Sequence, residues 1–179
     1  DPPRQGVYVT NDRRDPWEGS VRWSLETLDG TALAAGEEAV RAAPLATTAI
    51  KTFDLAGHVT DDNRRDLVFI AELWQGAQRV AWQTAYFAPT KHLSLVDPRV
   101  AVACRPNGER LQVELRGRSL ARLVELSLDG ADVIFSDNYF DLPAGRPVTV
   151  TCPLPAGWDE SRAATALQIR TVYDSFQYR

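Results

Sequence analysis

An alternation of apolar and polar residues with a period of two restricts this chain to β structure. Val21, Trp23, Leu25 and Thr27 alternate with charged or hydroxyl residues, which is the period of a strand with one buried face. The same alternation returns in residues 111–115, and turn dipeptides such as Asp29-Gly30 follow the runs. Because apolar residues at helical spacing are nearly absent, we predict an all-β protein.

The alternation and the turn residues between the runs predict a series of short strands. Residues 37–43 favour a helix by composition, but this stretch is short and uncapped, so we expect a strand there. Residues 160–166 are expected to form one helical turn before the last strand. The predicted strands are residues 7–9, 20–28, 34–42, 46–55, 67–75, 79–87, 100–104, 110–116, 120–128, 131–136, 148–152 and 165–172.

A domain boundary is expected in residues 88–98, which contain two prolines and after which the strand pattern restarts. Each half of the 179-residue chain is long enough to bury its own core. We therefore predict two domains, residues 1–95 and 96–179, each an antiparallel β-sandwich of immunoglobulin-like type. Two such sandwiches in tandem are the predicted architecture.

Charge and hydropathy argue against two classes of partner. The net charge is −4, and the cations are scattered among acidic residues, so we expect no nucleic-acid surface. No apolar run approaches the roughly 20 residues that cross a bilayer, and no signal segment opens the chain. We expect a soluble protein without a membrane partner, and favour the cytoplasm over secretion. The lack of Met and the opening Asp1-Pro2-Pro3 predict a fragment or a processed piece.

The two cysteines each close an alternating run, so each is expected to point inward with the valines of its strand. Cys104 ends residues 100–104 and Cys152 ends residues 148–152. If these strands face each other across the sandwich, a disulfide is geometrically allowed and contributes about 4 kcal/mol. Two buried free thiols are the alternative. There is no Cys-x-x-Cys or Cys/His cluster of the kind that binds zinc, and we expect no metal and no cofactor.

Other polar clusters do not predict a metal site or a catalytic centre. Residues 61–66 and 137–141 contain carboxylate and amide oxygens of the kind that bind calcium, but neither has EF-hand spacing. We expect a solvated loop at the first and a structural turn at the second. His58 and His92 accompany no Ser or Cys pattern and are expected at the surface.

One segment joins several of these features. Residues 135–150 read Phe-Ser-Asp-Asn-Tyr-Phe-Asp-Leu-Pro-Ala-Gly-Arg-Pro-Val-Thr-Val, which predicts a strand end, an aromatic loop, a Pro-containing turn and a new strand. The run 137–142 with Pro143 and Gly145 resembles the signature loop of the terminal β-sandwich domain of glycoside hydrolase family 2 β-mannosidases.

Two further segments resemble the same family in the same order. Residues 7–12 together with 19–25 resemble the opening of the immunoglobulin-like domain that follows the catalytic barrel. Residues 86–93 resemble the linker from that domain to the terminal one. The resemblance thus covers almost the whole chain and implies the C-terminal accessory region of such an enzyme.

The implied parent is a retaining exo-glycosidase that removes terminal β-mannose in a TIM barrel. Retaining chemistry uses two carboxyl groups about 5–5.5 Å apart. Nothing here resembles the catalytic motifs, so no catalytic residue is assigned and the chain is expected to be inactive by itself. The resemblance implies the catalytic domain of the parent as the partner. Family members that act on β-glucosaminides share similar accessory domains.

The five tryptophans are candidates for stacking on sugar rings. Trp23 and Trp82 are in phase with apolar residues of their strands, so we expect both in a core. Trp74 shares a face with Val68 and Ile70, and its facing is left open.

Trp17 and Trp158 fall in predicted loops, where an exposed ring would contact a sugar or the missing barrel. Together with Trp74, Tyr139 and Phe140 they form the candidate set for carbohydrate or interdomain contact. Two hypotheses follow: a support for the catalytic barrel with an exposed apolar patch that can also form a homodimer, or a binding module for mannan or a related β-mannoside-containing carbohydrate.

Overall fold

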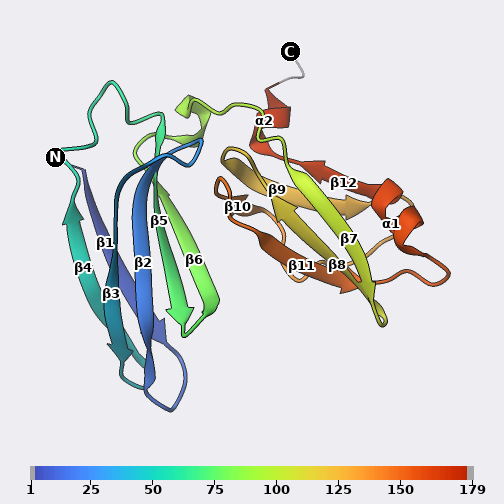
Figure 1. Cartoon of the computed structure of the whole chain (residues 1–179), viewed down its shortest axis with the longest axis horizontal. Coiled ribbons are helices and arrows are strands. Elements are labelled where there is room, and N and C mark those ends of the chain that lie inside the picture. Colours follow the sequence, from blue (N-terminus) through green and yellow to red (C-terminus); the bar gives the residue numbers. More distant parts are fainter. Residues whose placement is uncertain (1–2, 177–179) are drawn as a thin grey trace. The chain divides into compact units, whose positions relative to one another are not determined.

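The computed structural model describes residues 3–176, and the strands in them pair antiparallel throughout (Figure 1). These residues form two compact units. The first contains the residues up to Thr27 and Thr31–Ser94, and the second contains Leu28–Gly30 and the residues from Leu95 onward.

Unit 1 consists of two antiparallel sheets of unequal width. The smaller sheet pairs β1 (Arg4–Asn11) with β4 (Ala46–Asp54). The larger has the order β3 (Ala32–Ala42), β2 (Trp17–Thr27), β5 (Leu67–Gln75), β6 (Gln78–Tyr86) (Figure 1). Gly30 and Gly76 have φ of 92° and 58° in the two hairpin turns, a conformation that glycine adopts without strain. The turn predicted at Asp29-Gly30 is therefore confirmed, and β5 and β6 form a second hairpin.

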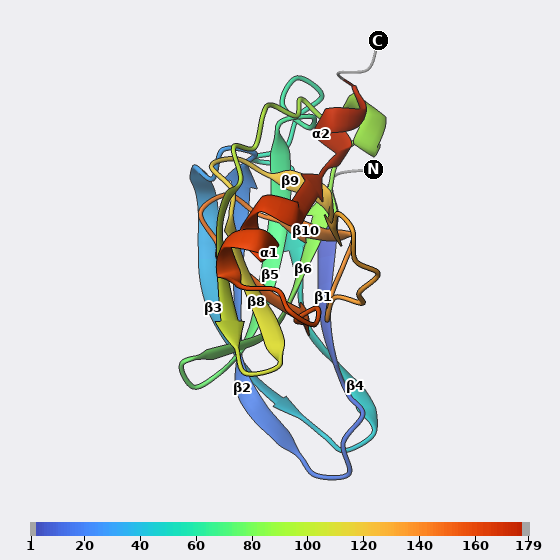
Figure 2. The ribbon, with the colours of Figure 1, turned by 90° about the vertical axis from the view of Figure 1, so that its right-hand side faces the viewer.

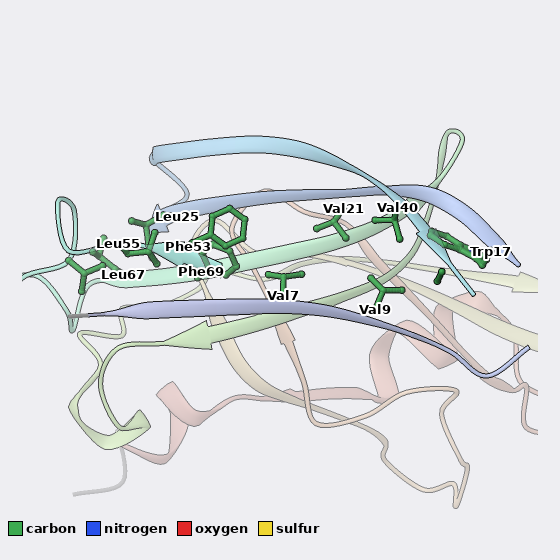
Figure 3. Packing of buried hydrophobic residues seen from close by; sticks show 12 residues of the cluster. Val7, Val9, Trp17, Val21, Leu25, Val40, Phe53, Leu55, Leu67 and Phe69 are labelled. Carbon is green, nitrogen blue, oxygen red and sulfur yellow. The ribbon is translucent and has the colours of Figure 1, made fainter. Parts of the chain in front are cut away.

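The core of unit 1 lies between these two sheets (Figure 3). Val21 and Leu25, in phase along β2, are 2% and 0% exposed, as the period of two predicts. Trp23 packs against Phe53 and Phe69, with ring centroids 4.4 Å and 6.2 Å away. Burying such side chains contributes about 1.5–3 kcal/mol each, so this aromatic group is a main source of stability.

The strand expected at residues 37–43 is confirmed as far as Ala42, where β3 ends, because β3 pairs with β2 along almost its whole length. Strand β4 pairs with β1 over its full length, with one irregularity between Val7 and Tyr8. Ser24 and Glu26, on the polar face of β2, are buried, and the Ser24 hydroxyl donates a hydrogen bond to the Glu26 carboxylate at 2.6 Å.

Unit 2 also has two antiparallel sheets. One has the order β11 (Val148–Pro153), β8 (Arg110–Arg116), β7 (Ala101–Asn107), and the other β10 (Phe140–Leu142), β9 (Ala121–Leu128), β12 (Leu167–Arg170). Two short helices, α1 (Glu160–Ala166) and α2 (Val172–Ser175), flank β12. Helix α1 lies beside β7 (Figures 1 and 2), and the Asp159 carboxylate caps it by accepting a hydrogen bond from the Arg162 N–H. The helical turn predicted at 160–166 is confirmed.

The strand predicted at residues 131–136 is wrong. Only an isolated bridge joins Ala131 to Leu128. Because β9 already pairs with β10 on one edge and with β12 on the other, residues 131–136 cannot pair with β9 as a further strand. The Ser136 N–H instead donates to the Thr151 carbonyl of β11 at 2.7 Å. Strand β10 and helix α2 were not predicted.

Candidate functional site

The signature loop of unit 2 holds β10 against β9 through its polar side chains. The Asn138 side chain makes two hydrogen bonds to the Leu126 backbone, accepting from N–H at 2.8 Å and donating to C=O at 3.0 Å. The Asp141 carboxylate accepts from Arg122 Nη1 at 2.7 Å and from the Leu123 N–H at 3.1 Å. These side chains replace strand pairing where the register between β9 and β10 shifts, as the predicted structural turn requires.

The two aromatic residues of this loop point in opposite directions. Phe140 is buried, which corrects its assignment as a surface contact. Tyr139 is 60% exposed and has a φ of 60°, which is strained for a residue with a side chain. Its hydroxyl donates to Glu125 Oε1 at 3.2 Å, and this hydrogen bond and the Glu125 charge raise the pKa of Tyr139. The loop therefore presents one fixed ring to solvent.

An aromatic–arginine cluster occupies the larger sheet of unit 1, on the face opposite the core. It consists of Arg22, Glu72, Trp74, Arg79 and Trp82, and strand register places them on this face. The guanidinium groups of Arg22 and Arg79 lie 4.4 Å and 4.8 Å from the ring centroids of Trp74 and Trp82. Arg79 Nη1 also pairs with Glu72 Oε1 at 2.8 Å. Sequence patterning did not reveal the two arginines. Arg22 meets Trp74 across strands, and Arg79 is three residues before Trp82 on β6, a spacing that regular alternation would place on opposite faces.

The position of Trp82 corrects the prediction that it lies in a core. It pairs with Glu72, which pairs with Arg22, so it lies on the face turned away from Trp23. Trp74 is on the same face and half-buried, and its indole N–H has no hydrogen-bond partner among residues 3–176.

A polar margin adjoins the aromatic–arginine cluster on β3. Glu37 Oε1 accepts a hydrogen bond from the Ser20 hydroxyl at 2.5 Å and lies 3.4 Å from Arg22 Nε. The Ser20 hydrogen bond, together with Arg22, lowers the pKa of Glu37. With one face of each ring covered by a guanidinium, the cluster resembles a charged contact surface more than a bare sugar platform.

The two loop tryptophans have different surroundings. Trp17 begins β2 and is 8% exposed in the core of unit 1, so it lies in a strand and its ring is not exposed as a sugar or barrel contact would require. Counting back from Val21 in steps of two would have placed it inside. Trp158 is half-buried between β11 and α1, with the Arg162 guanidinium 4.5 Å from its ring centroid. No described contact joins these rings into one site.

The cysteines are buried free thiols, and the condition for a disulfide is not met. Strands β7 and β11 lie in one sheet on either side of β8, with Cys104 opposite Val113 and Cys152 opposite Leu111. Two strand spacings separate their α-carbons by at least about 9.5 Å, whereas a disulfide needs less than about 7 Å. Val102, predicted to be interior with Cys104, is 40% exposed on the edge strand β7.

We predict that both thiols react slowly. Burial raises the pKa of Cys104 and of Cys152, and Glu160 adds to the first effect. Iodoacetamide at pH 8 should alkylate the native chain at least about tenfold more slowly than the urea-unfolded chain. As the pH rises, the thiols ionise at a lower pH in the unfolded chain than in the folded one. The free energy by which the neutral, buried thiols favour the folded state is therefore present below about pH 8.5 and is lost above it. Rapid native labelling, or a mass lower by two hydrogens, would contradict the assignment.

The polar loop between β4 and β5 is organised by its own hydrogen bonds. Asn63 accepts from the Thr60 N–H at 2.8 Å and donates to the His58 carbonyl at 2.8 Å, and Arg64 lies 3.3 Å from Asp61. Within the described residues, no three His, Cys, Asp or Glu side chains gather as a metal-binding group.

No helix in residues 3–176 has the length and hydropathy of a membrane span.

Solved structures of glycosidases contain the same arrangement of strands. The β-D-mannosidase of Dictyoglomus thermophilum matches with a TM-score of 0.83 and 17% identity, over 94% of this chain and 20% of that chain. The exo-chitosanase of Amycolatopsis orientalis matches with a TM-score of 0.68 and 16% identity, over 93% of this chain and 24% of that chain. The chain thus spans about a fifth to a quarter of these proteins, and at this identity the likeness shows the fold.

Sequence comparison with curated proteins finds no match. Two family models match in tandem, the mannosidase Ig/CBM-like domain at residues 6–92 and the Ig-fold domain at residues 95–175. Together they confirm the two tandem immunoglobulin-like sandwiches and the family resemblance of the sequence. The chain thus contains a mannosidase Ig/CBM-like domain at residues 6–92 and an Ig-fold domain at residues 95–175.

Proposed function

We propose that this chain is the non-catalytic accessory region of a β-mannosidase-like glycosidase, and that it supports a catalytic barrel in the rest of the parent protein. The observation that carries this proposal is the tandem of family matches, which covers residues 6–92 and 95–175 in the order expected from the resemblance. The share of only 20% of the similar β-D-mannosidase agrees with a region outside the catalytic part.

Exposed apolar side chains of unit 2 are candidates for the contact with the barrel. Leu123, Ile134 and Tyr139 are 43%, 85% and 60% exposed. Leu123 and Tyr139 also share the strained positive φ, at 48° and 60°, a feature that often marks functional surfaces. The same side chains predict weak self-association of the isolated chain, which sedimentation at increasing concentration measures.

The proposal predicts no glycosidase activity of the isolated chain and a less stable barrel without it. Purified chain should release no nitrophenol from 4-nitrophenyl β-mannoside. The barrel encoded by the parent gene should melt several degrees lower when expressed without residues 1–179. Nitrophenol release by the chain alone, or a barrel of unchanged melting temperature and kcat, would overturn the proposal.

Carbohydrate binding is the second candidate, and the CBM-like description of the family at residues 6–92 favours it. The covered faces of Trp74 and Trp82 argue against it, because sugars stack on free aromatic faces. We expect isothermal calorimetry with mannohexaose to show no saturable heat. Saturable heat that Trp74→Ala removes and Tyr8→Ala leaves intact would establish the binding module instead.

A further inference from the structure

A groove of about 470 Å³ lies in unit 1 between β1 and β6. Consecutive residues of both strands line it, 5–10 and 81–85, although neighbouring residues of a strand point to opposite faces. The groove is therefore bordered by the backbone edges of β1 and β6, and not by the side chains of a single sheet face alone. The remaining lining residues are Val21, Phe69, Ala71, Glu72 and Leu73.

The groove follows from the unequal widths of the two sheets. The sheet of β1 and β4 has two strands and faces a sheet of four, and β1 and β6 are terminal strands. On the other side of the unit, an ion pair between Lys51 and Glu38 joins β4 to β3. Among the described strands, β1 pairs only with β4. One position for a further strand is therefore left beside β1.

The floor of the groove carries two alanines with one polar residue between them. Strand register turns Ala81, Gln83 and Ala85 inward, opposite Leu73, Ala71 and Phe69. Ala81 is exposed and Ala85 is half-buried, so the two alanines leave room on either side of Gln83 that larger side chains would fill. The same register places Trp82 on the opposite face.

This chemistry matches an extended peptide better than a sugar. Tyr8, between the inward Val7 and Val9, is 63% exposed and lies on the outer face of β1, so no exposed ring forms a stacking platform on the floor. A strand added beside β1 would pair with its backbone and place alternate apolar side chains over the alanines, which is the geometry of β-strand addition.

We propose that the groove binds an extended segment of the parent protein as an additional strand on β1. The assignment of this segment to the parent protein rests on the function proposed above. The similar solved glycosidases have at least three quarters of their chain outside the matching region, so a parent of that kind has other segments to supply it. β1 spans Arg4–Asn11, so a segment of comparable length would cover it.

The test uses the whole 179-residue chain, labelled with ¹⁵N. The first probe is a synthetic peptide of alternating valine and threonine with a lysine at each end. We expect amide shift changes along β1 and β6, and hydrogen exchange of residues 5–10 slowed at least about tenfold at saturation. The second probe is a set of overlapping peptides that covers the rest of the protein encoded by the parent gene, of which at least one should move the same amides.

Two matched substitutions control the site. Ala81→Arg fills the floor of the groove with a charged side chain and should weaken peptide binding at least about tenfold. Ala49→Arg changes an exposed alanine of β4 outside the groove and should leave binding unchanged. Gln83→Lys is a second groove variant, and the amide spectrum of each variant verifies its fold.

The outcomes separate this proposal from the supporting role. Unchanged β1 amides, or equal binding by Ala81→Arg and the wild type, would overturn the groove as a peptide site even if the barrel needs the chain. Mannohexaose that moves the same amides would make it a sugar site. If the valine-threonine peptide binds but no peptide of the parent protein does, the proposal that the bound segment comes from the parent protein would be overturned.

Discussion

Replacing Phe69 with alanine is expected to lower the free energy of unfolding of unit 1 by about 3–5 kcal/mol. Phe69 is 2% exposed and packs against Phe53 and Trp23, with ring centroids 5.2 Å and 6.2 Å away. Its removal leaves a cavity between two sheets that strand pairing holds in place, so the core cannot collapse to fill it. Urea unfolding followed by tryptophan fluorescence measures the change.

The chain supplies a clear readout and control for this substitution. Trp17, Trp23, Trp74 and Trp82 lie in unit 1 and only Trp158 in unit 2, so fluorescence reports mainly on unit 1. Tyr8→Ala removes an aromatic side chain of the same unit that is 63% exposed, and should change stability by less than about 0.5 kcal/mol. A loss of less than about 1 kcal/mol for Phe69→Ala would contradict the close packing of Phe69 against Phe53 and Trp23.

Replacing Asp141 with alanine is expected to destabilise unit 2 by about 3 kcal/mol. The Asp141 and Arg122 side chains are 13% and 14% exposed and are joined at 2.7 Å, so the change removes a carboxylate from a largely buried cation. The change also removes the acceptor for the Leu123 N–H. Leu123 has a strained φ of 48°, so it loses a hydrogen bond that holds this conformation. Hydrogen exchange of the amides in β8 and β9 reports on unit 2 directly.

Asp132→Ala is the matched control, because Asp132 is an exposed carboxylate in the neighbouring loop. It should leave exchange of the β9 amides within about twofold of the wild type. Equal effects of the two substitutions would show that the signature loop does not depend on the Asp141 carboxylate. A parallel Asn138→Ala variant, which loses both bonds to Leu126, should also destabilise unit 2.

Aromatic residues show the limit of the period of two. Alternation states which residues share a face of a strand, but not which of the two faces is turned to a core. For β2 the choice was correct, because Val21, Trp23 and Leu25 are the larger apolar set. For β6 it was wrong: Trp82 is the largest side chain of the strand, yet pairing with Glu72 turns it away from the core.

The candidate site was predictable only in part. The turn role of residues 137–141 followed from residue type, because Asn and Asp satisfy nearby backbone groups. Arg22 covers Trp74 from a different strand, and Arg79 covers Trp82 from three residues earlier on β6. Regular alternation would place Arg79 and Trp82 on opposite faces, but the register shift between Leu73 and Trp74 brings them to the same one. The groove depends on Ala81 and Ala85, which look unremarkable in a strand until the sheet opposite them is known to end at β1.

The alternation of residues along one strand is a property of the local sequence. The sequence therefore predicted most of the strands, the tandem of sandwiches and the burial of Cys104 and Cys152, and its turn residues predicted the hairpins of unit 1. Competition for strand edges is not local. Residues 131–136 have strand-like composition but form no strand, because residues 140–142 and 167–170 occupy both edges of β9. The same reason keeps the two thiols apart, since β8 lies between their strands. Tertiary structure alone decides such pairings, because each hydrogen-bonding edge accepts one neighbour and distant segments compete for it.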